Sequence, residues 1–142
     1  MVLIPQFGKP HGTYRDRPGA YAVIYDDKGQ MLTVLVRGIC HLPGGGIDQN
    51  EDPALAVTRE VKEETGYKIA SLKKIGEANQ FFETTALGPI NKLGTYFSGH
   101  VEMEPPTKTQ ESDHEVRWMS PEEFLSSSAD DFHKWAVKKS LE

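Results

Sequence analysis

Apolar residues along this chain alternate between short β-type runs and one stretch with helical spacing. Positions 20–25 and 30–36 are rich in β-branched and aromatic residues and predict two strands near the start of the chain. The segment between them, Asp26-Asp27-Lys28-Gly29, has the composition of a tight turn. We therefore expect the two strands to pair as an antiparallel hairpin.

The second half of the pattern predicts three further strands. Positions 68–78 and 93–101 are β-rich, and residues 84–91 between them contain the Thr, Gly, Pro and Asn typical of a loop. A short strand is expected at positions 116–119. The rest of the chain is therefore expected to form strands around the central helical stretch.

The central stretch, positions 54–65, contains no helix-breaking residue and predicts a helix of about three turns. Pro53 suits the first turn, where its missing N–H costs nothing, and Gly66 can end the helix in a left-handed conformation. The apolar residues that recur at helical spacing, and that we expect to be buried, are Ala54, Val57 and Val61.

Two shorter helices are predicted near the C-terminus. Ser120, with Glu123 three residues later, has the pattern of a capping box that opens a helix. A last helix is expected from Asp130 or Asp131 to Ser140. Together with the strands, these helices indicate a chain of mixed α and β structure.

The central predicted helix carries three acidic residues on one side. Glu60, Glu63 and Glu64 stand at i, i+3 and i+4, so their carboxylates project from one face. Like charges at this spacing repel, and a hard divalent cation with oxygen ligands removes the repulsion. Acidic helix faces are ordinarily just solvated. Glu51 at the helix entrance and the glycines at 44–46, whose backbone a metal or phosphate can approach closely, favour a metal site instead.

Arg59 lies beside these carboxylates, and its forked guanidinium suits it, with Glu51, to orient them. The segment from Gly45 to Tyr67 fits the pattern G-x5-E-x7-R-E-U-x-E-E-x-G-U at all seven fixed positions. The chain therefore resembles the Nudix family, which implies an α/β chain of the α+β type with a mixed β-sheet sandwiched between α-helices. Tyr67 departs from the aliphatic residue of the pattern. His41 stands where many relatives carry Trp. It either faces the substrate or, as we expect, is an exposed strand-end residue.

The resemblance implies hydrolysis of a nucleoside diphosphate linked to a further moiety, with Mg²⁺ or Mn²⁺ as the cofactor. By position in the family motif, Glu60 and Glu64 are the principal metal ligands. Glu63 is a third ligand or a water-positioning carboxylate, and the Gly44 carbonyl is a backbone ligand. The same three glutamates are the catalytic candidates, and their spacing leaves open which one acts as the base.

Candidates for substrate binding lie outside this segment. Arg37, at the end of the second predicted strand, is the first candidate for a phosphate contact, and Arg17 is the second. Phe132 and Trp135 stand at i, i+3 on the last helix and could stack on a flat ring, although core packing is the more frequent role for each. Glu115, just before the last predicted strand, is the candidate for a fourth acidic ligand.

Motifs typical of several Nudix subfamilies are absent from the sequence. Phe82 stands where many ADP-ribose pyrophosphatases carry Pro, and Thr84 and Thr85 lie where diadenosine polyphosphate hydrolases carry Tyr. By elimination, the resemblance is strongest to MutT-type pyrophosphohydrolases, whose nucleoside triphosphate substrates include oxidised ones. The alternatives are hydrolysis of ADP-ribose, a dinucleoside polyphosphate or a nucleotide sugar, and, in another class, a non-catalytic nucleotide-binding sensor.

Charge and cysteine content narrow the expected partners. The 142-residue chain has 16 basic and 21 acidic residues, and the net charge of 16 − 21 = −5 favours a small nucleotide over a nucleic-acid polymer. The single cysteine, Cys40, excludes an internal disulfide and suits a reducing cytoplasm. The apolar start is too short for a signal peptide or membrane span. We expect one domain over residues 1–142, present as a monomer or homodimer.

Overall fold

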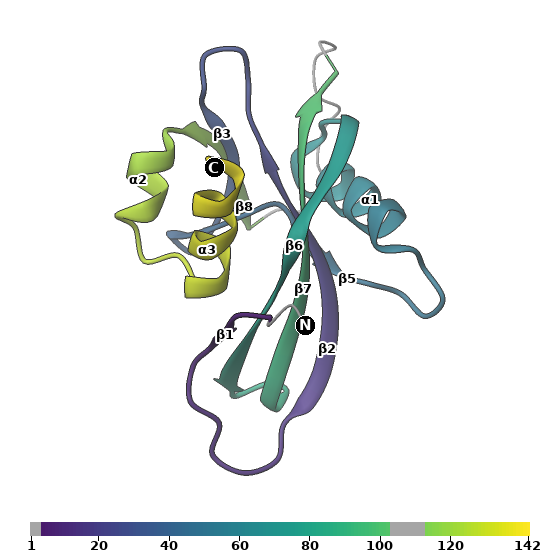
Figure 1. Cartoon of the computed structure of the whole chain (residues 1–142), viewed down its shortest axis with the longest axis vertical. Helices are drawn as coiled ribbons and strands as arrows, with labels where there is room; N and C mark the ends of the chain where they lie inside the picture. The colour runs from purple at the N-terminus through teal and green to yellow at the C-terminus, as the bar shows by residue number, and fades with distance from the viewer. Residues whose placement is uncertain (1–3, 103–112) are drawn as a thin grey trace.

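The computed structural model describes residues 4–102 and 113–142, and within these ranges the centre of the molecule is a five-stranded sheet with helices on both sides (Figure 1). In spatial order its strands are β1 (Gln6–Phe7), β6 (Ile69–Thr84), β7 (Gly88–Val101), β2 (Arg15–Ile24) and β5 (Gly44–Gly46). The pairs β2–β7 and β1–β6 are parallel, whereas β6–β7 and β2–β5 are antiparallel. The expectation of a mixed sheet is therefore confirmed.

A second sheet, three-stranded in the described part of the chain, has the order β4 (Ile39–His41), β3 (Met31–Val36) and β8 (His114–Met119). The expected hairpin of β2 and β3 is therefore wrong. The chain does reverse after Asp26, whose amide donates to the Gln30 carbonyl at 2.9 Å. After an isolated bridge between Tyr25 and Met31, however, the two strands enter different sheets. The reason is that β7 and β5 occupy the two edges of β2.

Strands β6 and β7 form a long hairpin that extends through most of the loop predicted at residues 84–91. Thr84 pairs with Gly88, so only residues 85–87 connect the strands. Polar residues of the predicted loop form hydrogen bonds across the hairpin. For example, Asn91 Oδ1 accepts a hydrogen bond from Asn79 Nδ2 at 2.8 Å. The loop prediction was wrong because these cross-strand contacts are not visible in local composition.

Helix α1 (Pro53–Thr65) begins and ends where the sequence predicts. Gly66 has a φ of 79°, and its N–H donates to the Lys62 carbonyl at 2.9 Å, so the helix ends in the expected left-handed conformation. Of the expected apolar face, Val57 and Val61 are fully buried, whereas Ala54 is half-buried and packs at the edge. Ala56 and Thr65 complete the buried face.

The C-terminal helices also match their predictions. Helix α2 (Pro121–Leu125) begins after Ser120, whose hydroxyl accepts a hydrogen bond from the Glu123 N–H at 3.1 Å. Helix α3 (Asp131–Ser140) follows after residues 126–130. None of the helices in residues 4–102 and 113–142 is long and apolar enough to cross a membrane.

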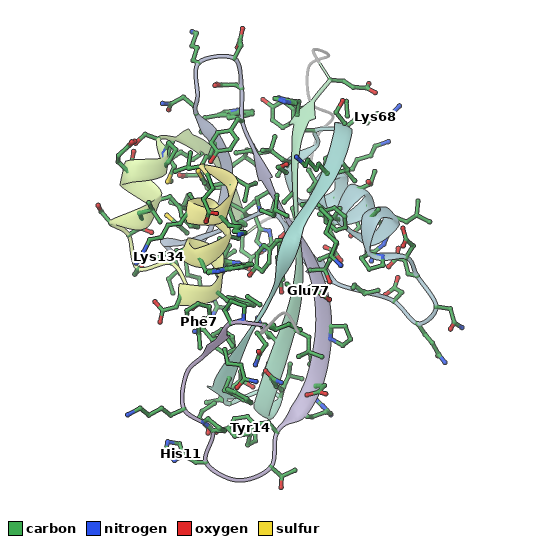
Figure 2. All side chains as sticks on the ribbon, viewed as in Figure 1. Phe7, His11, Tyr14, Lys68, Glu77 and Lys134 are labelled. Carbon is green, nitrogen blue, oxygen red and sulfur yellow. The ribbon has the colours of Figure 1, made fainter. Side chains whose placement is uncertain are left out.

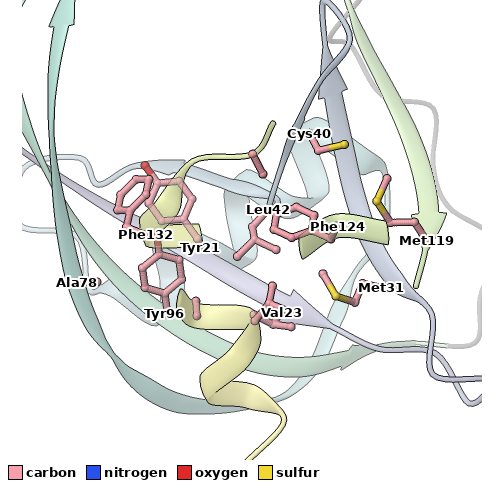
Figure 3. Packing of buried hydrophobic residues seen from close by; sticks show 13 residues of the cluster. Tyr21, Val23, Met31, Cys40, Leu42, Ala78, Tyr96, Met119, Phe124 and Phe132 are labelled. Atoms are coloured by element: carbon pink, nitrogen blue, oxygen red, sulfur yellow. The ribbon is translucent and has the colours of Figure 1, made fainter. Parts of the chain in front are cut away.

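Side chains fill the space between the central sheet and the helices on each side (Figure 2). Alternate residues of β2 supply the two cores. Tyr21 and Val23 belong to the cluster shared with α3, where Tyr21 lies with Tyr96 and Phe132 (Figure 3). The residues of β2 that instead pack with α1 are Ala20, Ala22 and Ile24. Both faces of β2 are therefore buried, and this strand fixes the position of α1 relative to α3.

Replacing Phe132 with Ala should lower the free energy of unfolding by about 3–5 kcal/mol, because the ring is 1% exposed and its loss leaves a cavity in the core. Urea denaturation measures the change. The matched control is Leu55→Ala on α1, where the side chain is 65% exposed and the expected change is within about 0.5 kcal/mol. Equal losses in the two variants would contradict the burial of Phe132.

Candidate active site

Arg59 lies at the centre of a group of carboxylates at the start and on one face of α1. Its Nε and Nη2 each donate to a different oxygen of Glu51 at 2.9 Å, a paired geometry that is strong and specific in direction. Its Nη1 donates to Glu60 Oε1 at 3.0 Å and lies 3.4 Å from both oxygens of Glu63. Arg59 and Glu51 thus have the contacts that an orienting role requires.

Arg59 also ties α1 to the loop that follows β5. Its Nη2 donates to the Gly46 carbonyl at 3.2 Å and lies 3.5 Å from Asp48 Oδ2. Glu51 closes the same loop by accepting from the Asp48 N–H at 2.9 Å. The hydrogen bonds from Arg59, and then that from the Asp48 amide, lower the pKa of Glu51 to about 2, so this carboxylate is ionised throughout the neutral range.

Two glycines of β5 allow the carboxylates of α1 to lie directly against the strand. Gly44 has a φ of 148°, and a Cβ there would lie 2.2 Å from the Ala20 carbonyl oxygen. A Cβ on Gly45 would lie 2.7 Å from Glu60 Oε2. The Gly44 N–H donates to Glu64 Oε1 at 2.8 Å. Glu60 and Glu64 therefore lie beside consecutive residues of one strand, which a larger side chain would push apart.

His114, on β8, is the neighbour of Glu64 that the sequence did not single out. Its Nδ1 lies 3.6 Å from Glu64 Oε2, and the two side chains are 16% and 13% exposed. Among the described residues, this buried Nδ1 makes no hydrogen bond. Side chains alternate along β8, and Val116 and Trp118 pack with the core under α1. That alternation is the signal that would have identified His114.

Glu115 is corrected as a candidate fourth acid. Because it follows His114 on the strand, its side chain projects from the opposite face. It is exposed and lies 3.4 Å from Arg117 Nη2 rather than beside the glutamates of α1.

The chemistry of the donor set fits a hard divalent cation. Glu51, Glu60, Glu63, Glu64 and Arg59 have formal charges that sum to 1 − 4 = −3, and the anionic groups among them are all carboxylates. Mg²⁺ and Mn²⁺ prefer such oxygen ligands. Glu60, Glu63, Glu64 and the carbonyl of Gly44 are the groups that would hold the ion.

A cavity of about 320 Å³ opens beside β5 and Glu64. Arg17 and Lys92 supply positive charge to its wall, which suits phosphate groups. Arg37, the first candidate in the sequence, lies instead in the exposed turn between β3 and β4 with a φ of 53°. The structure therefore corrects the order of the two arginines. Val36, the last residue of β3, still lines the cavity, but Arg37 follows it in the turn, whereas Arg17 of β2 is itself part of the wall.

Phe132 and Trp135 are corrected as ring-stacking residues. Phe132 is surrounded by other core rings, with its centroid 5.8 Å from that of Tyr96. Trp135 is half-buried and covers Gly76, where a Cβ would lie 2.9 Å from the Trp135 ring. Phe132 therefore packs in the core and Trp135 packs against it, and neither side chain lines the cavity.

The aromatic side chains that do line the cavity are Tyr21, His41 and His133. The expectation that His41 is exposed is wrong, because it is half-buried, and burial lowers its pKa. His133 lies next to Phe132 on α3 but is rotated around the helix toward the cavity. Sequence periodicity could not separate these roles, since several faces of this short helix are buried.

The ion pair of Glu51 should shape the acid stability of the protein. The pKa of Glu51 is lower in the folded protein than in the unfolded chain, so its ion pair stabilises the fold at pH values above the unfolded pKa. That contribution is lost as the pH falls from about 4.5 to about 2. Glu51→Gln should remove this part of the pH dependence, so its melting temperature should fall less steeply over that range than the wild-type value. Glu77→Gln, at an exposed position of β6, is the control. If the melting temperature of Glu51→Gln fell with pH as steeply as that of the wild type, the role of the ion pair would be contradicted.

Comparison with known proteins identifies the family. The chain is 38% identical over 92 residues to a candidate 8-oxo-dGTP diphosphatase of Bacillus subtilis, a match covering 57% of this chain and 62% of the relative. It is also 38% identical over 65 residues to an ADP-ribose pyrophosphatase of the same organism, covering 41% of this chain and 35% of that protein. The matches thus span less than two thirds of either relative.

The fold is likewise shared with solved structures. A NUDIX hydrolase from Nitrosomonas europaea superposes with a TM-score of 0.75 at 22% identity, over 89% of each chain. The family model described as the NUDIX domain matches residues 15–139, which is most of the chain. This protein therefore belongs to the NUDIX family.

Proposed function

We propose that this protein hydrolyses the pyrophosphate linkage of a nucleoside triphosphate, as MutT-type members of its family do, with Mg²⁺ or Mn²⁺ as the cofactor. The observation that carries the proposal is the position of Glu64. Its carboxylate belongs to the group gathered around α1 and also lines the cavity that contains Arg17 and Lys92. Groups for holding a cation and groups for holding phosphate therefore meet at one place.

The residues of the chain have separate tasks in this reaction. Glu60, Glu63 and Glu64 would hold the cation, which when bound would offset phosphate charge and lower the pKa of a coordinated water. Arg59 holds Glu60 and Glu63 in place through its Nη1. The Gly44 N–H fixes one oxygen of Glu64, which limits the directions its other oxygen can take. One of the three glutamates accepts the proton of the attacking water.

Arg17 and Lys92 bind the phosphate oxygens and offset the charge that develops on them during hydrolysis. The glycines of β5 leave the backbone open to close approach by the phosphate chain. Tyr21, on the same cavity wall, offers an aromatic surface to the base. A cavity of about 320 Å³ is at the small end of the usual range for ligand sites, which favours one nucleotide over a dinucleotide.

The relatives support two substrate classes. The longer match is to the candidate 8-oxo-dGTP diphosphatase, and a shorter one is to the ADP-ribose pyrophosphatase. We place nucleoside triphosphates, including oxidised ones, first. ADP-ribose, dinucleoside polyphosphates and nucleotide sugars are the alternatives to be assayed beside them. Product formation that requires Mg²⁺ and stops with EDTA would separate all of these from a non-catalytic sensor.

Glu64→Gln should lower turnover by about 10² or more on every accepted substrate, because it removes a charged ligand that acts in the transition state. Release of phosphate or pyrophosphate from the substrate panel in Mg²⁺ measures this. The matched control is Glu115→Gln. The Glu115 side chain is exposed on the face of β8 opposite His114, so this variant should retain wild-type turnover. Wild-type rates in Glu64→Gln would overturn the proposed role of the cation site.

Arg17→Ala should lower kcat/KM by about tenfold or more, the effect of losing one hydrogen bond to a charged group. The factor should be similar for all accepted nucleotides, because they share phosphate and differ in the base. Arg37→Ala, in the exposed turn, is the comparison and should leave kcat/KM unchanged. The reverse result would restore Arg37 as the phosphate ligand.

A further inference from the structure

A second group of metal-ligating side chains lies apart from the glutamates of α1, where β4 meets the start of α3. His41 ends β4, Asp130 immediately precedes α3, and His133 lies in its first turn. One ligand atom from each lies within 4.8 Å of the other two. Within residues 4–102 and 113–142, this is the one group of three His, Cys, Asp or Glu side chains with that geometry.

His133 is held in a fixed orientation. Its Nδ1 lies 2.8 Å from the Tyr96 hydroxyl, and its ring stacks on Phe132 with centroids 4.4 Å apart. An edge contact with Tyr21, at 4.7 Å between centroids, restrains the ring further. Imidazoles that bind metals usually have the second ring nitrogen held by a hydrogen bond in this way. With Nδ1 engaged by Tyr96, Nε2 is the nitrogen left for a ligand.

The surroundings of the three side chains also suit a cation. His133 is buried, and His41 and Asp130 are half-buried, so the group is largely shielded from water. Burial raises the pKa of Asp130, which shows that its negative charge is poorly solvated. Although Asp130 is the N-cap of α3, its carboxylate makes no capping hydrogen bond. A cation would offset that buried charge.

Lys92 is the one feature that opposes a cation at this position. It lies close enough to the group to lower the pKa of His41, His133 and Asp130. Its Nζ lies 5.1 Å from the centroid of the Phe82 ring, a cation–π contact that attracts the ammonium group toward that ring. The positive charge of Lys92 therefore weakens the attraction of Asp130 for a divalent ion but does not abolish it.

We propose that His41, Asp130 and His133 form a second cation site, selective for a borderline divalent ion of the Zn²⁺ or Co²⁺ class. Two imidazoles and one carboxylate match the ligands of such ions, whereas the all-oxygen group on α1 suits Mg²⁺ or Mn²⁺. Three protein ligands leave a coordination position open. Because His41 and His133 line the same cavity as Glu64, a molecule bound in the cavity could supply the remaining ligand.

Cobalt binding in excess Mg²⁺ tests the site, because Mg²⁺ fills the oxygen ligands and Co²⁺ bound by histidine absorbs visible light. The protein is prepared without a histidine tag, stripped with a chelator and titrated with Co²⁺. About one equivalent should bind with a visible absorption band, and Zn²⁺ should abolish that band. No substrate is present, so the result is independent of whether the proposed hydrolysis is correct.

Two variants locate the ion. His41→Gln and Asp130→Asn should each weaken Co²⁺ binding at least about tenfold, the scale of losses around metal sites. They are chosen over His133 substitutions because His133 is fully buried and its loss endangers folding. Circular dichroism confirms that each variant is folded. Lys92→Met should bind Co²⁺ more tightly than wild type, since it removes the opposing charge.

Two controls separate this site from other ligands in the chain. His100→Gln, at an exposed position of β7, and Glu64→Gln, in the oxygen cluster, should both keep the wild-type cobalt affinity. The proposal is overturned if folded wild-type protein shows no cobalt band in Mg²⁺. It is also overturned if His41→Gln and Asp130→Asn retain the band, because the cobalt would then be bound elsewhere in the chain.

Discussion

The ion pairs of Arg59 are the interaction on which the site depends. Several carboxylates on and beside one helix repel each other, and this repulsion would drive the side chains apart into solvent. A single guanidinium joins Glu51, Glu60 and Glu63, and through Gly46 it also anchors the loop between β5 and α1. Its planar, forked donors fix the direction of each carboxylate as well as its charge, which a lysine could not do. The helix therefore keeps an excess of negative charge in a defined arrangement.

The second constraint is the burial of β2 on both faces. Residues facing one way pack under α1, and residues facing the other way pack with α3. The same strand lines the cavity through Arg17 and Tyr21, and its neighbour β5 presents Gly44 and Gly45 to the glutamates. A shift of β2 by one residue would exchange its two faces and dismantle both cores together. Core packing thus determines the distance between the helix that holds the carboxylates and the helix that completes the cavity.

The cavity combines groups of different chemistry within a small volume. On one side are hard oxygen donors and the backbone of β5, and on another are the imidazoles of His41 and His133 with Asp130. Arg17 and Lys92 add positive charge. Burial lowers the pKa of the two imidazoles, whereas the ion pair with Arg59 lowers the pKa of Glu51 beside α1. The carboxylates and the imidazoles therefore differ in chemistry although Glu64 and both histidines line the same cavity.

The sequence by itself determined the features that depend on residues a few positions apart. The ends of α1, the capping of α2 by Ser120 and the placement of three glutamates on one helix face follow from local geometry. It could not separate β2 from β3, rank Arg17 above Arg37, or bring His41 together with Asp130 and His133. Those outcomes depend on which strand edges are already paired and which helix face is covered. They are decided by contacts between residues far apart in the chain, which only the tertiary structure contains.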